Sequence, residues 1–265
     1  MKRRNFLASG LLLLSHIAGI SSAQAQVSSI TDAINKSGRQ RMLSQRMAKA
    51  YLQIGLEIDV ERSKKILDLS LSTFDRQAVE LRAYAPSSEI KSALLEMEKT
   101  WTVYKELLVG KNPNKHDAKT IMAISEDMLR MNDSITSQLE KHAGSSAGQL
   151  VNLAGRQRML SQRMAKYYQA AQWGVIPADG NSKLDAARKE FITSMSALNN
   201  APSNNSRIKE ELAIAQLQWV FFDNALKQTE DSKSRNIAAT NVATTSERLL
   251  EIMDKVTGMY QQLST

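Results

Sequence analysis

The dodecapeptide "GRQRMLSQRMAK" occupies residues 38–49 and recurs, letter for letter, at residues 155–166. Each copy mixes three arginines with methionine, leucine and alanine and contains neither proline nor a β-branched residue, so each favours a helix. Identity over twelve residues marks an internal repeat, which is the feature to establish first in any chain. The two copies therefore suggest that the 265 residues form two related halves.

Outside the dodecapeptides, the two halves agree in the spacing of their apolar residues. Leu67 and Phe74 match Leu184 and Phe191, seven residues apart in each half, and Trp101 and Trp219 stand at the middle of matching apolar segments. Spacings of three, four and seven indicate one apolar face of a helix. Prolines and glycines interrupt the pattern and mark the connections. The pattern predicts eight helices, near residues 28–57, 60–84, 88–109, 116–143, 147–173, 182–199, 206–230 and 233–262.

Four amphipathic helices with short connections pack as an up-down-up-down bundle. We therefore expect an all-α fold made of two tandem antiparallel four-helix bundles, one over residues 26–143 and the other over residues 147–265. The stretch 144–148, "GSSAG", joins them, either as a loop or as part of one long helix.

The first 25 residues have the features of an export signal. Lys2, Arg3 and Arg4 precede the largely apolar residues 6–20, and Ala23-Gln24-Ala25 is a cleavage pattern. "RRNFL" fits twin-arginine export, although Sec signals also carry paired arginines, and an uncleaved anchor is the alternative to cleavage. No later stretch is apolar enough to span a bilayer. We expect a periplasmic mature chain without a transmembrane segment.

Composition argues against several functions. The chain has 35 basic and 27 acidic residues and a formal net charge of +8, three of whose cations belong to the signal, so nucleic acid is not an expected partner. The absence of cysteine excludes thiolate metal sites and cysteine nucleophiles. Known catalytic and phosphate-binding motifs are missing. We therefore expect no enzyme activity, no metal site and no cofactor.

Helical periodicity separates the arginines of the dodecapeptide into two groups. Arg41 lies seven residues after Ile34 and seven before Ala48, so it falls on an apolar seam, and Arg158 does the same in the second copy. The remaining arginines, which can be solvated or can pair with acids of neighbouring helices, are Arg39, Arg46, Arg156 and Arg163.

Burying an arginine has a consequence, because an unpaired buried guanidinium costs several kcal/mol and cannot deprotonate. Arg41 and Arg158 each need either an internal carboxylate or a bound anion. Gly38 and Gly155 precede them by three residues on the same side, where a missing side chain lets another helix or a small ligand approach. A plain packing motif with structural ion pairs remains an alternative, although packing alone does not require twelve identical residues.

"INKSGRQRMLSQRM" and "VNLAGRQRMLSQRM" resemble the P-box of NarX-type nitrate and nitrite sensor domains, and more closely that of the PilJ-type domain of type IV pilus chemoreceptors. The resemblance extends over two tandem domains. It implies four-helix bundles, and in the nitrate-binding members a ligand held between two P-box helices of a dimer by the arginine before the methionine. Carried over, the ligand-binding residues are Arg41, Arg158, Gly38 and Gly155, with Asn35, Asn152, Arg46 and Arg163 as weaker candidates.

The resemblance implies a periplasmic protein that binds nitrate or nitrite, with one chain building the site that receptors build by dimerising. The alternative is a ligand-free interaction module that docks on a membrane chemoreceptor, a sensor kinase or a pilus component; an exported enzyme is a third, weaker possibility. Receptors of this type carry membrane helices and an output domain, and we expect neither in the mature chain. If Arg41 and Arg158 face each other without a carboxylate between them, the ligand is favoured. If each pairs with its own Asp or Glu, the module is favoured.

Overall fold

The computed structural model describes residues 26–110, 112–228 and 235–263. The expected export signal at residues 1–25 lies outside them. The described residues form helices and connections without any β-strand, which confirms the all-α fold predicted from the repeat. The helices are α1 (Ile30–Gly55), α2 (Val60–Tyr84), α3 (Ser88–Leu108), α4 (Lys115–Ala143), α5 (Ser146–Trp173), α6 (Gly180–Asn199), α7 (Ser206–Lys227) and α8 (Arg235–Gln262).

Short polar residues set where several of these helices begin. The side chains of Ser29, Ser87 and Asn114 each accept a hydrogen bond from a backbone N–H in the first turn of the helix that follows. Such caps satisfy donors that a helix cannot satisfy internally. The connection between the repeats is a tight turn, because α4 ends at Gly144 in the left-handed conformation and Ser145 caps α5. α4 and α5 are therefore separate helices joined by a turn, and not one long helix.

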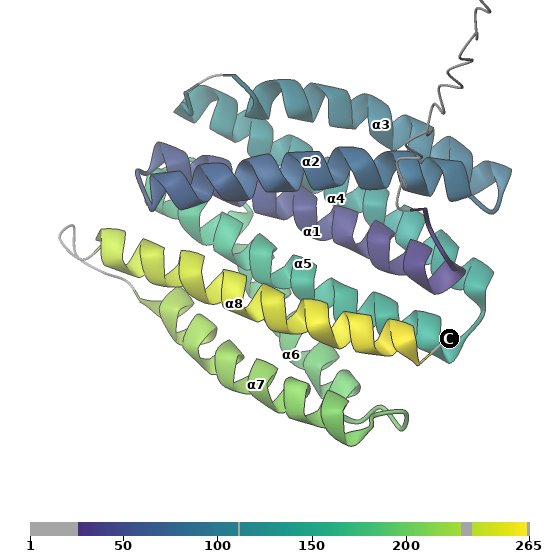
Figure 1. Cartoon of the computed structure of the whole chain (residues 1–265). Coiled ribbons are helices and arrows are strands. Elements are labelled where there is room, and N and C mark those ends of the chain that lie inside the picture. The colour runs from purple at the N-terminus through teal and green to yellow at the C-terminus, as the bar shows by residue number, and fades with distance from the viewer. Residues whose placement is uncertain (1–25, 111, 229–234, 264–265) are drawn as a thin grey trace, which may run out of the picture.

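The eight helices lie in layers, with the two dodecapeptide helices at the centre (Figure 1). α1 and α5 pack against each other more extensively than any other described pair, and each also packs on the last helix of its own repeat, α4 or α8. Helices α2 and α3 cover one side, and α6 and α7 cover the other (Figure 1). The two four-helix repeats thus meet along their P-box helices, and one hydrophobic core runs through both.

The aromatic residues matched between the repeats occupy equivalent places. Trp101 stacks on Phe74 with ring centroids 4.0 Å apart, and Trp219 stacks on Phe191 at 4.3 Å. Each tryptophan fixes the third helix of its repeat against the second. No described helix is long and apolar enough to cross a membrane.

Candidate functional site

The centre of the molecule is the crossing of α1 and α5, which run parallel: Ile34 lies against Gly148 near their N-terminal ends, and Gly55 lies against Trp173 at their C-terminal ends. Arg41 Nη2 donates to Asn152 Oδ1 at 2.7 Å, and Arg158 Nη2 donates to Asn35 Oδ1 at 2.8 Å. Each arginine therefore reaches the asparagine six residues before the other arginine. The reciprocity shows that a pseudo-twofold axis passes between the two P-box helices. The sequence placed these four residues in the candidate site, and the fold brings them together.

Gly38 and Gly155 lie where the two guanidinium groups converge. A Cβ atom at Gly38 would lie 3.1 Å from Arg41 Nη2 and 3.7 Å from Arg158 Nη2, and one at Gly155 would meet the same two atoms with the distances exchanged. The nearest atoms at both positions belong to the arginines alone, with no carboxylate among them. The glycines thus give two cations from different repeats room to approach one point.

Each arginine also has a carboxylate partner in its own repeat. Arg41 Nη1 donates to Asp133 at 2.6 Å, and Arg158 Nη1 donates to Asp254 at 2.5 Å. Both aspartates are partly open to solvent, whereas both arginine side chains are fully buried. The criterion for a ligand site and the criterion for an interaction module are therefore both met. The Nη2 atoms face each other without a carboxylate, as a ligand site requires, and the Nη1 atoms are paired with aspartate, as a ligand-free module requires.

Burial lowers the pKa of both central arginines. It lowers the pKa of Arg158 to about 10, with Asp254 opposing the shift and Arg39 adding to it, and it lowers the pKa of Arg41 against the effect of Asp133. Both remain charged at neutral pH. The Nε atom of each is buried without a hydrogen-bond partner. Two buried cations with unused donors are the kind of site that accepts a small anion.

Outer arginines of the dodecapeptides connect the repeats at the same aspartates. Arg39 donates to Asp254 at 2.7 Å, and Arg156 donates to Asp133 at 3.0 Å. Each aspartate thus receives one arginine from each repeat. Arg39 and Arg156 are about one-third exposed, so their ion pairs contribute less than those of the buried pair.

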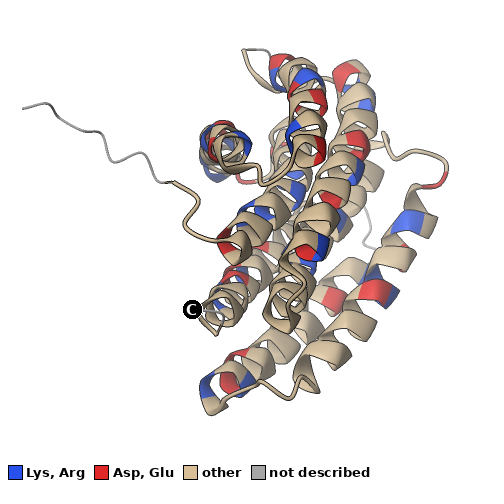
Figure 2. Cartoon of the chain, turned by 90° about the vertical axis from the view of Figure 1, so that its right-hand side faces the viewer, with Lys and Arg blue, Asp and Glu red and all other residues tan. Residues whose placement is uncertain are grey.

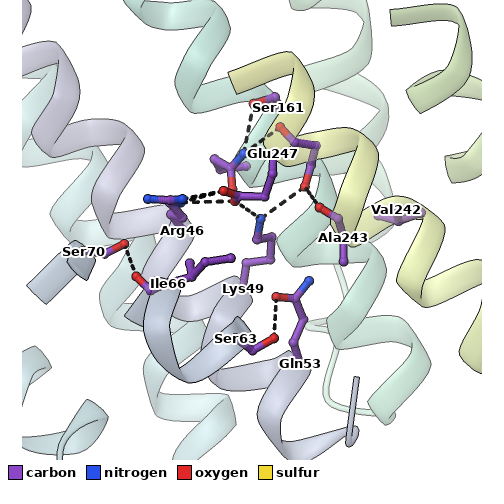
Figure 3. A network of polar contacts seen from close by, with 12 residues as sticks. Arg46, Lys49, Gln53, Ser63, Ile66, Ser70, Ser161, Val242, Ala243 and Glu247 are labelled. Atoms are coloured by element: carbon purple, nitrogen blue, oxygen red, sulfur yellow. Dashed lines mark hydrogen bonds and ion pairs between the residues drawn. The ribbon is translucent and has the colours of Figure 1, made fainter. Parts of the chain in front are cut away.

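The weaker candidates Arg46 and Arg163 do not reach this centre. Arg46 instead forms a bidentate ion pair with Glu247, to which Lys49 Nζ also donates at 2.5 Å (Figure 3). In the pseudo-symmetric cluster, Arg163 pairs with Glu126, and Lys166 Nζ donates to that carboxylate at 2.7 Å. We call these the two lysine clusters. Both link a P-box helix of one repeat to the last helix of the other.

The lysine clusters are deeply buried. Lys49 and Lys166 are fully shielded from solvent, and burial lowers the pKa of each to about 8 even though a glutamate opposes the shift. The cations in turn outweigh burial at the carboxylates and lower the pKa of Glu126 and of Glu247 to about 2. These lysines and glutamates are therefore charged at neutral pH. Their mutual pairing is what allows them to be buried.

Sequence reasoning did not assign the aspartates and glutamates that complete these sites. The signal was present, because "SEDMLRMND" at residues 125–133 and "SERLLEIMD" at residues 246–254 place Ser, Glu and Asp at the same positions in both repeats. A repeated acid in a helix that faces the P-box is a candidate partner for a repeated arginine. Among the described residues no group of acids and histidines is suited to a metal ion.

Comparison with protein families gives one assignment. The family described as type IV pili methyl-accepting chemotaxis transducer N-terminal domain, PilJ, matches the chain twice, over residues 23–123 and 142–245. The chain belongs to the PilJ family. The two matches agree with two tandem PilJ repeats. No curated protein and no solved structure matches the sequence.

Membership in the PilJ family indicates a sensory or interaction module of chemotaxis transducers. PilJ is a family of sensory domains and not of enzymes. Arg41 lies in the first PilJ match and Arg158 in the second, so the two PilJ repeats face each other through the helices that carry the dodecapeptide.

Proposed function

We propose that this chain is a periplasmic sensory module that binds a small anion, nitrate or nitrite, between its two P-boxes. The observation that carries the proposal is the convergence of Arg41 and Arg158 beside Gly38 and Gly155. Two like charges held at about 4 Å in a medium of effective dielectric near 20 repel by about 4 kcal/mol. An anion between them would replace that repulsion with attraction, and a planar anion with several oxygens matches two guanidinium forks.

The ion pairs of the two arginines define how such a ligand would have to fit. Their Nη1 atoms are engaged by Asp133 and Asp254, so the ligand would use Nε and Nη2. The Nη2 atoms now donate to Asn152 and Asn35, whose amides would turn toward the ligand or release the arginines. We infer that Asn35 and Asn152 hold the guanidinium groups in place when the anion is absent.

Thermal unfolding with different anions tests this function. At a hundredfold excess over its dissociation constant, a ligand of the folded state adds about 2.7 kcal/mol to the free energy of unfolding. Nitrate or nitrite should therefore raise the melting temperature more than equal chloride does. Arg41→Ala or Arg158→Ala should remove that increment and keep the helical content, and lysine at either position should restore it only in part.

Two other arginines serve as matched controls. Arg39→Ala should reduce the nitrate increment much less, because Arg39 contacts Asp254 and is not among the groups nearest to Gly38 and Gly155. Arg130→Ala should not change it, because Arg130 is exposed and pairs with Asp127 on the surface. If chloride and nitrate shift the melting temperature equally, or if the shift survives both alanine substitutions, the anion site does not exist.

A second candidate function is a ligand-free interaction module that docks on a membrane chemoreceptor, a sensor kinase or a pilus component. The pairing of each buried arginine with an aspartate of its own repeat favours it, because the cations then have partners without a ligand. Calorimetric titration with nitrate, nitrite and sulfate separates the two candidates. Heat of binding that Arg41→Ala abolishes supports the anion site, whereas its absence supports the module.

A further inference from the structure

The charges at the crossing of α1 and α5 are balanced before any ligand arrives. Within the described part of the chain, Arg41 has one ion-pair partner, Asp133, and Arg158 has one, Asp254. Burial alone would raise the pKa of Asp254, but Arg158 and Arg39 outweigh it and lower that pKa below its usual value, so this carboxylate is ionised at neutral pH. Basic and acidic positions are interspersed in the same way along the helices (Figure 2). Two carboxylates thus offset the two guanidinium groups that would face an anion.

Contacts from the opposite repeat hold both aspartates in place. The oxygen of Asp133 that binds the central arginine also accepts a hydrogen bond from Arg156, at 3.0 Å. The oxygen of Asp254 that binds the other central arginine accepts one from Arg39, at 2.7 Å. A carboxylate bound by two arginines on different helices is not free to swing away when an anion arrives. We therefore expect both negative charges to stay beside a bound ligand.

The groups around this centre are balanced as well. The two outer arginines add positive charge, and two further carboxylates offset it. These are Glu190, which pairs with Arg156, and Glu140, which accepts a hydrogen bond from the amide of Asn152. Four arginines and four carboxylates thus surround the crossing, and their charges cancel.

We propose that Asp133 and Asp254 make the crossing selective for an anion with one negative charge over an anion with two. This inference rests on the anion site proposed above and adds the charge class of its ligand. Two buried guanidinium groups without carboxylates would match a doubly charged anion, whereas the balanced arrangement leaves the charge of any ligand uncompensated. Since the free energy of burying an ion grows with the square of its charge, the second charge of sulfate costs more than the first.

Calorimetric titration of the full chain with sodium nitrate and with sodium sulfate, at one ionic strength, tests the proposal. Heat of binding is measured because sulfate stabilises folded proteins without occupying a site. The parent chain should bind nitrate about tenfold more tightly than sulfate, or better. Asp133→Asn and Asp254→Asn keep the shape of the side chain and remove its charge. Each should therefore lower the ratio of the dissociation constants, sulfate over nitrate, by about tenfold.

Because a buried arginine without its aspartate can prevent folding, a milder variant accompanies these two. Glu140→Gln gives the first repeat the residue that the second repeat carries at the same place, since "DSITSQLE" at residues 133–140 aligns with "DKVTGMYQ" at residues 254–261. Glu140 reaches Arg41 only through Asn152, so the ratio should fall in the same direction but by less.

Asp127→Asn is the matched control, because it removes the same charge from the same helix. Asp127 is exposed and pairs with Arg130 at the surface, so the ratio should stay at the parent value. A parent chain that binds neither anion overturns the proposed function together with this inference. If the parent binds nitrate but binds sulfate equally well, or if its preference survives in Asp133→Asn, Asp254→Asn and Glu140→Gln alike, the anion site stands and the role of the aspartates is overturned.

Discussion

Lys49 of the first repeat donates a 2.5 Å hydrogen bond to Glu247 of the second, and both side chains are buried. Together with Arg46, this contact joins the two repeats at a point far along the chain from the turn that links them. An ion pair in such a place is costly to disrupt, because the remaining partner keeps its charge without access to water.

Removing one partner of this cluster should therefore destabilise the fold strongly. We expect Glu247→Gln to lower the free energy of unfolding by about 3–5 kcal/mol, measured by chemical denaturation. Glu96→Gln, which breaks an exposed pair with Lys99, should cost no more than about 1 kcal/mol. Adding Lys49→Met to Glu247→Gln should recover part of the loss. A single substitution that costs no more than Glu96→Gln would show that the cluster is not held as described.

Acid should unfold the protein through the same carboxylates. The folded-state pKa of Glu126 and of Glu247 is about 2, below the ordinary value of 4.5, so each stabilises the fold above pH 4.5 and loses its contribution as the pH falls toward 2. A shift of this size corresponds to roughly 3 kcal/mol per group. The lowered pKa values of Lys49 and Lys166 change the stability only between about pH 8 and pH 10.5, where the cost of burying their charge is relieved as the pH rises, so they do not enter this window.

Denaturation midpoints measured from pH 7 to pH 3 check this expectation. Stability should fall steeply below pH 4.5, and the slope should be shallower in Glu247→Gln, which has one carboxylate fewer to protonate. An identical slope in the variant and the parent would mean that other acids govern the acid transition.

Two helical glycines should respond in opposite ways to alanine. Gly258 has no atom within 4 Å of its potential Cβ, so Gly258→Ala should stabilise α8 by about 0.5–1 kcal/mol. At Gly38 the new methyl would press on the guanidinium groups of Arg41 and Arg158. We expect Gly38→Ala to give no such gain and to weaken any response to nitrate. Equal stabilisation by the two substitutions, measured by thermal melting, would show that the space beside Gly38 is not needed.

The first repeat alone should not persist as a monomer. Residues 26–143 would expose the face of α1 that packs on α5 and would leave Arg46 and Lys49 without Glu247. A second copy of this fragment could replace the missing repeat, since α5 carries the same dodecapeptide and Glu126 corresponds to Glu247. We expect the fragment to dimerise or to unfold, as measured by light scattering and circular dichroism. A stable folded monomer would contradict the shared core.

Much of the fold could be predicted because its signals are local. Apolar spacing located all eight helices, and their ends fall close to the predicted ones where the structure describes them; residues 229–234, which include the predicted end of one helix and start of the next, lie outside the described residues. The seam that contains Arg41 and Arg158 was also correctly predicted to be buried. Both inferences need only the periodicity of a single helix.

The partners of the arginines could not be predicted in the same way. Periodicity shows which face of a helix is buried, but it does not show which residue of another helix lies opposite. Asp133 and Glu247 were therefore not assigned, and Arg46 was placed among the weaker ligand-binding candidates although it pairs with Glu247 across the two repeats. The anion-binding role of Arg41 and Arg158 remains a prediction.

The two asparagines that accept hydrogen bonds from the central arginines have different partners of their own. Asn35 donates its amide to the neutral side chain of Gln261, whereas Asn152 donates its amide to the carboxylate of Glu140. In a homodimer both halves of a site are encoded by one stretch of gene, so they can only change together. Two repeats in one chain can differ, and here Glu140 contacts Asn152 directly, whereas on the other flank Gln261 stands between Asn35 and the carboxylate of Asp32. A guest held at this axis would therefore experience a directional field and take up one preferred orientation.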